Sequence, residues 1–129
     1  TRTFFLNSAN DYQKDFYNEV LKANLIGIEK SIINNTLDIV DDSVLKLLEQ
    51  SKYNEFIVHK TGHGLGLDVH EDPYVMRGNM EKIVAGMVIT IEPGLYNPNL
   101  LGVRIEDDVF ITSEGPEILT KFTKELTII

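Results

Sequence analysis

The 129-residue sequence predicts an α+β fold, and two observations carry this prediction. Apolar residues recur at helical spacing through roughly the first fifty residues, whereas from residue 56 onward β-branched runs alternate with Gly and Pro. Helices that come first and strands that come later favour separate α and β parts over alternating βαβ units. The sequence shows no internal repeat or low-complexity segment that would contradict one domain or part of one.

Two helices are predicted in the first part of the chain. The first begins at Asn10-Asp11, where Asn10 is an N-cap candidate, and runs to about Ser31. Its apolar stripe consists of Phe16, Val20, Ala23, Ile26 or Gly27, and Ile28. The second is predicted from about Leu37 to Ser51, after an Asn-Asn turn signal. Its apolar face consists of Ile39, Val40, Val44, Leu45, Leu47 and Leu48.

Strands are predicted in the second part. The strongest signal is the β-branched run at residues 87–91, which Gly86 and Pro93 bound. Further strand-like pieces lie at residues 103–106 and 108–112, and short edge strands are predicted at 118–119 and 126–129. The glycine-rich stretch between residues 56 and 78 indicates loops with short extended pieces.

Composition narrows the classes of protein that fit this chain. Hydrophobic residues make up 43%, enough for a core, yet no apolar run approaches the roughly 20 residues of a membrane span. A net charge of −8 argues against nucleic acid as a partner. The sequence contains no cysteine, which excludes a thiolate metal site and fits a cytoplasmic protein without a membrane partner. It begins with Thr1 rather than Met and has no secretory signal there, so we expect a fragment or a processed product.

All three histidines of the chain, His59, His63 and His70, lie within twelve residues. A single histidine is as often a buried, hydrogen-bonded side chain as a functional one, but the clustering favours a site. His63 stands between glycines in Gly62-His63-Gly64-Leu65-Gly66, and glycines allow a sharp turn and a close backbone approach. On its own this motif indicates only a tight turn.

Two glutamates strengthen the case for a site. Glu92 directly follows the apolar strand at 87–91, and an unpaired carboxylate in such surroundings would be costly. Glu106 follows Val103-Arg104-Ile105 in similar strand context. The two-residue period of a strand places Arg104 and Glu106 on one face, where Arg104 orients a carboxylate or forms an ordinary structural ion pair. His63, Glu92 and Glu106 together form a nitrogen and oxygen ligand set that suits Mn²⁺ and, with the imidazole, Co²⁺, Fe²⁺ or Zn²⁺.

Four segments, in order, resemble the motifs of the pita-bread metallopeptidases, which include Xaa-Pro dipeptidase (prolidase), aminopeptidase P and methionine aminopeptidase. They are His59-Lys60-Thr61-Gly62-His63-Gly64-Leu65-Gly66-Leu67, His70-Glu71-Asp72-Pro73, Thr90-Ile91-Glu92-Pro93-Gly94-Leu95-Tyr96 and Gly102-Val103-Arg104-Ile105-Glu106-Asp107. The last segment and Tyr96 favour the prolidase and aminopeptidase P branch. The resemblance implies that residues 1–129 are the C-terminal part of a pita-bread catalytic domain, with two helices packed on a curved antiparallel sheet. The N-terminal domain and the first part of the catalytic domain would be absent.

The resemblance also implies a role for each site residue. The implied metal ligands are His63, Glu92 and Glu106, with Glu106 bridging two divalent ions, Mn²⁺ first and Co²⁺ or Zn²⁺ as alternatives. The implied catalytic residues are His59, His70, Glu92 and Arg104. Glu92 would also shuttle a proton, and His70 would stabilise the tetrahedral intermediate. His59 would line the substrate pocket, and Arg104 would orient the ligand carboxylates.

One departure from the family pattern concerns the start of the chain. Family members read Asp-x-Thr-Arg-Thr-Phe where this chain begins with Thr1-Arg2-Thr3-Phe4, so one Asp ligand would lie two residues upstream of Thr1. The resemblance implies a second Asp ligand further upstream. Two divalent ions carry four positive charges, whereas Glu92 and Glu106 supply two negative ones. We therefore expect this chain to bind at most one ion, weakly, to be inactive alone, and to expose apolar surface that promotes self-association.

These patterns lead to one functional expectation and two alternatives. The parent protein is expected to hydrolyse Xaa-Pro bonds in proline-containing peptides, and the resemblance implies that it is a homodimer. The first alternative is a pita-bread binding module without catalysis. The second is a metal-free hydrolase resembling creatinase, against which the presence of both Glu92 and Glu106 counts. The sequence does not distinguish a dipeptidase from an aminopeptidase.

Overall fold

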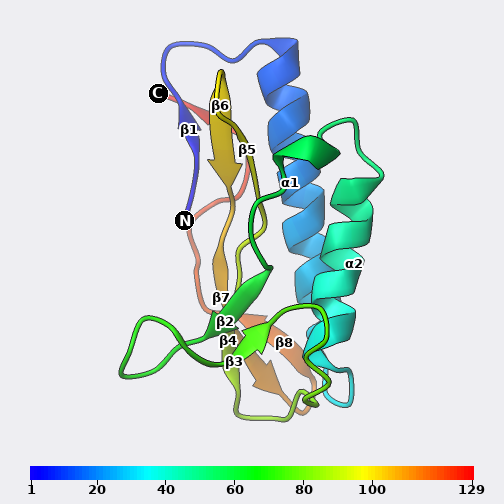
Figure 1. The fold of residues 1–129 in the computed structure, drawn as a ribbon. Helices are drawn as coiled ribbons and strands as arrows, with labels where there is room; N and C mark the ends of the chain where they lie inside the picture. Colours follow the sequence, from blue (N-terminus) through cyan, green and yellow to red (C-terminus); the bar gives the residue numbers. More distant parts are fainter.

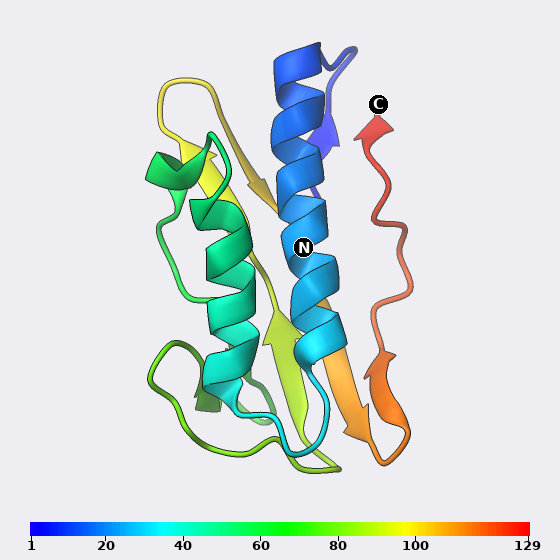
Figure 2. The same ribbon diagram turned by 90° about the vertical axis from the view of Figure 1, so that its right-hand side faces the viewer.

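A computed structural model describes all residues, 1–129 (Figure 1). Helices α1 (Asp11–Lys30) and α2 (Leu37–Glu49) lie side by side and cover one face of the strands (Figure 2). A short 3₁₀ helix, η1 (Asn54–Phe56), leads from α2 into the strands. The predicted α+β class, with two helices ahead of the strands, is confirmed. Neither α1 nor α2 combines the length and apolar character that crossing a membrane would require.

The strands form three separate sheets rather than one continuous one. The nine strands are β1 (Phe4–Phe5), β2 (Gly62–Gly64), β3 (Glu71–Val75), β4 (Val88–Ile91), β5 (Gly94–Asn97), β6 (Leu101–Arg104), β7 (Asp107–Thr112), β8 (Gly115–Ile118) and β9 (Thr127–Ile128). An antiparallel five-stranded sheet has the order β3-β2-β4-β7-β8, and β5 and β6 form a separate antiparallel hairpin. The two ends of the chain meet where β1 pairs in parallel with β9.

The boundaries of the strands correct one prediction. The strand expected at residues 103–106 ends at Arg104, so Glu106 lies in the connection between β6 and β7. The strand expected at residues 87–91 is confirmed as β4, and Glu92 follows it directly. Pro93, which has no N–H to donate, then separates β4 from β5. Both glutamates therefore lie where the five-stranded sheet gives way to the β5–β6 hairpin.

Helix α1 begins with a capping box, as the Asn10 signal predicts. The Asn10 side chain accepts a hydrogen bond from the Gln13 N–H at 2.9 Å, and the Gln13 side chain accepts one from the Asn10 N–H at 2.8 Å. Each side chain satisfies a backbone donor that the helix itself leaves without a partner. The helix ends at Lys30, one residue before the predicted end.

Removal of this cap should weaken the fold measurably. Asn10→Ala is expected to lower the free energy of unfolding by about 1 kcal/mol, because the N–H of Gln13 loses its acceptor. Asn18→Ala is the matched control, since Asn18 is an exposed residue inside the same helix and alanine is the better helix former there. Urea unfolding measures both variants. Equal stability of the two would contradict the role of the cap.

Helix α2 buries a narrower stripe than its sequence predicts. Its fully buried residues include Val40, Val44 and Leu48, whereas Ile39 of the predicted apolar face is 41% exposed. The helix also ends at Glu49, two residues before Ser51. Asp41 lies among the buried residues with 1% exposure, a position that the apolar pattern does not indicate.

The core has two parts, one for each group of strands. The first joins residues of α1 and of the C-terminal half of α2 to the β5–β6 hairpin, and the second joins the start of α2 to the five-stranded sheet. Gly27 of α1 lies where both helices meet β4, because a Cβ there would be 2.7 Å from Ile91 and 3.0 Å from Val44. This close packing holds α1 and α2 against the strand that leads to Glu92.

Candidate metal centre

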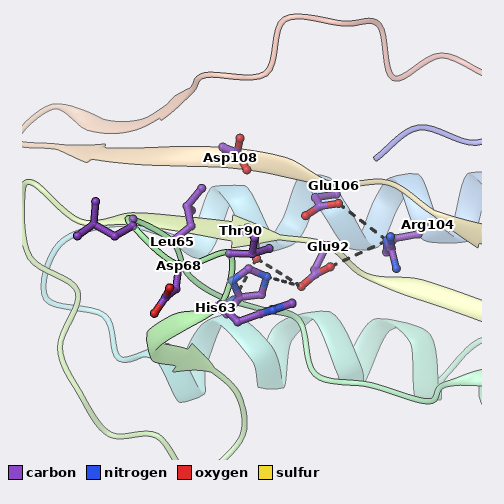
Figure 3. A pocket seen from close by; sticks show the side chains of 12 residues that line it. His63, Leu65, Asp68, Thr90, Glu92, Arg104, Glu106 and Asp108 are labelled. Atoms are coloured by element: carbon purple, nitrogen blue, oxygen red, sulfur yellow. Dashed lines mark hydrogen bonds and ion pairs between the residues drawn. The ribbon is translucent and has the colours of Figure 1, made fainter.

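Three side chains from separate segments converge beside the end of β4 (Figure 3). They are His63 on β2, Glu92 after β4 and Glu106 in the connection between β6 and β7. One possible ligand atom from each lies within 4.8 Å of the other two. Bonds of about 2.1 Å to a common ion would span about 4.2 Å between opposite ligand atoms, so this spacing is close to that of a shared site.

The backbone places His63 and Glu92 relative to each other. The His63 N–H donates to Thr90 Oγ1 at 3.0 Å, and the Glu92 N–H donates to the carbonyl oxygen of Thr61 at 2.7 Å. The approach is so close that a Cβ at Gly62 would lie 2.8 Å from the carbonyl carbon of Thr90. The glycine predicted to permit a close approach is therefore required by the pairing of β2 with β4.

A backbone hydrogen bond selects the tautomer of His63. Its Nδ1 lies 2.8 Å from the carbonyl oxygen of Gly64, which can only accept, so Nδ1 carries the proton. In a neutral ring Nε2 then presents its lone pair, and this atom lies 3.2 Å from Glu92 Oε1. A proton on Nε2 or a cation bound by both atoms satisfies this contact, so the pair is compatible with a metal site. Neutral imidazole with a bound Nδ1–H is the usual form of a histidine metal ligand.

Arg104 lies beside both carboxylates. Its Nε is 4.0 Å from Glu92 Oε2 and 3.9 Å from Glu106 Oε2. The pKa of Arg104 is raised: its partial burial acts to lower it, but hydrogen bonding to Tyr96 and the charges of Tyr96 and both glutamates outweigh that. Arg104 and Glu106 are thus neighbours, as predicted, although Glu106 is not in the strand.

The Glu106 carboxylate is held by residues at the start of the chain and by Arg104. Its Oε2 accepts a hydrogen bond from the hydroxyl of Thr1. Partial burial acts to raise the pKa of Glu106, but the Thr1 contacts and the charge of Arg104 lower it below its usual value. Glu106 is therefore ionised at neutral pH, as a metal-binding carboxylate must be.

The three candidate ligands line an open cavity of about 660 Å³. Its lining includes His70, whose ring centroid is 4.4 Å from that of His63. Thr90, Asp68 and Asp108 also line it, and sequence reasoning did not single them out. Figure 3 shows Asp108 on β7 and Asp68 on the opposite side of the cavity, both apart from the three candidate ligands.

His59 lies outside this cavity lining, and it contacts the site only through other residues. Its Nδ1 is 2.7 Å from the carbonyl oxygen of Lys60, so in a neutral ring Nε2 accepts from the Tyr96 hydroxyl at 3.1 Å. That hydroxyl in turn accepts from Arg104 Nη1 at 3.4 Å. The predicted contact of His59 with substrate therefore remains a prediction, while its link to Arg104 through Tyr96 is a structural finding.

The fold and the side chains define a class: an α+β domain in which one imidazole and two carboxylates form a candidate site for a divalent cation. Residues 1–113 match the model of metallopeptidase family M24. The chain belongs to this family. The predicted resemblance and the pita-bread fold are thereby confirmed, with the three-sheet arrangement described above.

Named relatives agree with this family membership. The chain is 40% identical over 126 residues to the Xaa-Pro dipeptidase of Pyrococcus furiosus. It superimposes on Xaa-Pro dipeptidase from Bacillus anthracis with a TM-score of 0.95, at 40% identity over 99% of this chain. The X-Pro aminopeptidase of Thermotoga maritima gives a TM-score of 0.94 at 30% identity, again over 99% of this chain. The chain spans only 36% of the length of each of these three proteins.

Proposed function

We propose that the protein to which this chain belongs hydrolyses the peptide bond that precedes proline, with divalent metal ions bound by His63, Glu92 and Glu106. The convergence of these three side chains carries the proposal, together with about 40% identity to proteins named Xaa-Pro dipeptidase. Bound there, a divalent ion would polarise the scissile carbonyl and lower the pKa of a bound water. Mn²⁺ suits the carboxylate-rich set best, and Co²⁺ or Zn²⁺ suits the imidazole.

The chain's own side chains supply the remaining chemistry of the proposal. Glu92 lines the cavity beside His63, and its carboxylate would take a proton from the attacking water. The exposed His70 in the cavity lining would donate a hydrogen bond to the oxygen that gains charge during attack. Arg104, within 4.0 Å of both carboxylates, would hold them in a fixed orientation.

The ligand set limits how much metal this chain holds. Glu92 and Glu106 balance the charge of one divalent ion, so we propose that the chain by itself binds one ion weakly and is inactive. Two ions and catalysis would require further carboxylates from the rest of the protein. Residues 1–129 would then form part of a larger catalytic domain, which agrees with the length of the relatives. A homodimeric protein and a cytoplasmic location remain predictions from the sequence.

A titration with metal ions tests the binding site on this chain. Isothermal titration calorimetry with Mn²⁺, Co²⁺ and Zn²⁺ should find at most one ion per chain. Glu106→Gln should weaken binding at least as much as the loss of a supporting side chain, which costs about 10–100-fold. Asp108→Asn is the matched control, because Asp108 lines the same cavity outside the three ligands and its loss should change affinity little.

Activity is tested on a longer protein that contains these residues. It should cleave an Xaa-Pro dipeptide when Mn²⁺, Co²⁺ or Zn²⁺ is supplied, and chelation should abolish cleavage. Cleavage without any metal would favour the creatinase-like alternative. Failure to cleave with any of the three metals would favour the binding-module alternative and contradict the proposal.

A further inference from the structure

Helix α2 contains a buried carboxylate that no charged side chain neutralises. Asp41 is 1% exposed and accepts two backbone hydrogen bonds, from the Thr61 N–H at 2.8 Å and from the Arg77 N–H at 2.7 Å. Burial of an ionised carboxylate is costly unless strong hydrogen bonds compensate, and N–H bonds to a carboxylate are stronger than neutral ones. The positions of these two N–H donors show which segments of the chain the carboxylate connects.

Both donors lie at the ends of one hairpin. Thr61 directly precedes β2, which carries His63, and Arg77 follows β3 by two residues. The carboxylate of Asp41 therefore joins the two ends of the segment that contains His63 and His70. Strand β2 has only three residues, and its pairing with β3 shifts register after His63, so the strand alone provides little rigidity.

Thr61 also connects Asp41 to a second candidate ligand. While its N–H donates to Asp41, its carbonyl oxygen accepts the N–H of Glu92 at 2.7 Å. Thr61 is thus the single residue that links the Asp41 carboxylate to the backbone of Glu92. Thr61 also lies two positions before His63 in the sequence. A displacement of Thr61 would therefore move His63 relative to Glu92.

We propose that Asp41 is a positioning residue of the metal centre. Its carboxylate fixes Thr61 against α2, and this sets the placement of His63 Nε2 relative to Glu92 Oε1, now 3.2 Å apart. Asp41 contacts neither ligand and acts only through the backbone of Thr61. The effect of Asp41 on metal binding rests on the proposed function. The effect of Asp41 on the backbone of Thr61 does not.

The neighbouring residue provides a matched control. Asp42 lies on the same helix and pairs with Lys46 at 2.6 Å and with Arg77 Nε at 3.2 Å, on the surface. Asp42→Asn removes a negative charge next to Asp41 without removing an acceptor from Thr61. Asp41→Asn removes the same charge and leaves one oxygen for two N–H donors, while its new NH₂ group faces one of them.

Two measurements on folded protein at low temperature test the proposal. In metal-free protein, Asp41→Asn should speed hydrogen exchange of the Thr61 and Glu92 amides at least about tenfold, whereas Asp42→Asn should not. Calorimetry with Mn²⁺ should show about 10–100-fold weaker binding in Asp41→Asn, the range for partners that orient ligands, and little change in Asp42→Asn. Asp41→Glu keeps both oxygens but moves them by one methylene, and it serves as the second variant if Asp41→Asn does not fold.

The outcomes separate this inference from the proposed function. If exchange at Glu92 is the same in wild type and in the folded Asp41 variant, Asp41 does not position the site and the inference is wrong. The inference is also wrong if exchange changes but Mn²⁺ affinity does not. If wild-type protein binds no Mn²⁺, the proposed metal site on this chain fails, and the exchange at Glu92 alone decides whether Asp41 controls the geometry.

Discussion

Gly62→Ala is expected to destabilise the chain by about 3 kcal/mol or more, because no side chain fits between β2 and β4. A Cβ at this position would overlap the carbonyl oxygen of Thr90, lie 2.8 Å from its carbonyl carbon and 3.0 Å from its Oγ1. The obstacle is backbone of a central strand and cannot rotate away, as a flexible side chain could. Strand β2 would have to move outward from the five-stranded sheet.

The same substitution should also disable the candidate metal centre. His63 is the next residue, and its N–H bonds to Thr90 Oγ1, the atom that the new methyl group would crowd. Urea unfolding and calorimetry with Mn²⁺ measure the two effects. Gly78→Asn is the control, since nothing lies within 4 Å of a Cβ there and asparagine tolerates its positive φ of 86°. A folded Gly62→Ala variant with unchanged stability and metal affinity would show that the packing is looser than described.

Arg2→Ala is expected to destabilise the chain by about 3 kcal/mol, because it leaves a buried carboxylate underneutralised. Asp107 is completely buried, and Arg2 Nη2 pairs with its Oδ1 at 2.6 Å. Lys124 Nζ lies 2.9 Å from Oδ2, without hydrogen-bond geometry, and would remain as partial compensation. The expected loss therefore lies at the lower end of the range of about 3–5 kcal/mol for breaking a buried pair.

Two further variants separate the charge effect from loss of packing. Arg2→Met with Asp107→Leu and Lys124→Met removes all three charges and should recover part of the stability lost in Arg2→Ala, since apolar residues often replace a buried ion cluster without loss. The recovery is partial because the carbonyl groups that Arg2 contacts still lack a donor. Arg77→Ala removes a cation whose side chain is 41% exposed, and its effect should be much smaller because water screens such pairs. Equal losses in Arg2→Ala and Arg77→Ala, measured by urea unfolding, would contradict the role of burial.

The Arg2 network also bears on the candidate site. Arg2 Nη1 donates to the carbonyl oxygen of Glu106 at 2.5 Å, and Arg2 Nε donates to that of Thr123 at 2.9 Å. The start of the chain, the Glu106 ligand segment and the C-terminal segment are thereby connected. In Figure 1 the two ends of the chain lie beside each other, with β1 next to the C-terminal strand. The loss of stability in Arg2→Ala should consequently be accompanied by weaker binding of Mn²⁺.

The sequence alone determined the order of the elements and the identity of the candidate ligands. Helical periodicity predicted α1 and α2 to within two residues, because capping and apolar spacing are local signals. The residues around His63, Glu92 and Glu106 carried the family motifs, so the ligand set followed without coordinates. The end of β6 at Arg104 was missed, because residue 105 is as apolar and β-branched as the strand before it.

Tertiary structure decided how those ligands are held. Arg2 and Asp107 are 105 positions apart, and Asp41 lies 20 positions before Thr61, so no local pattern joins either pair. In the sequence Asp41 resembles any other charged residue of an amphipathic helix. Only the folded structure shows that its carboxylate is buried and accepts hydrogen bonds from two backbone N–H groups. Sequence specifies which atoms can bind a metal ion, since that depends on residue type. Their placement depends on contacts between distant segments, which exist only after the chain has folded.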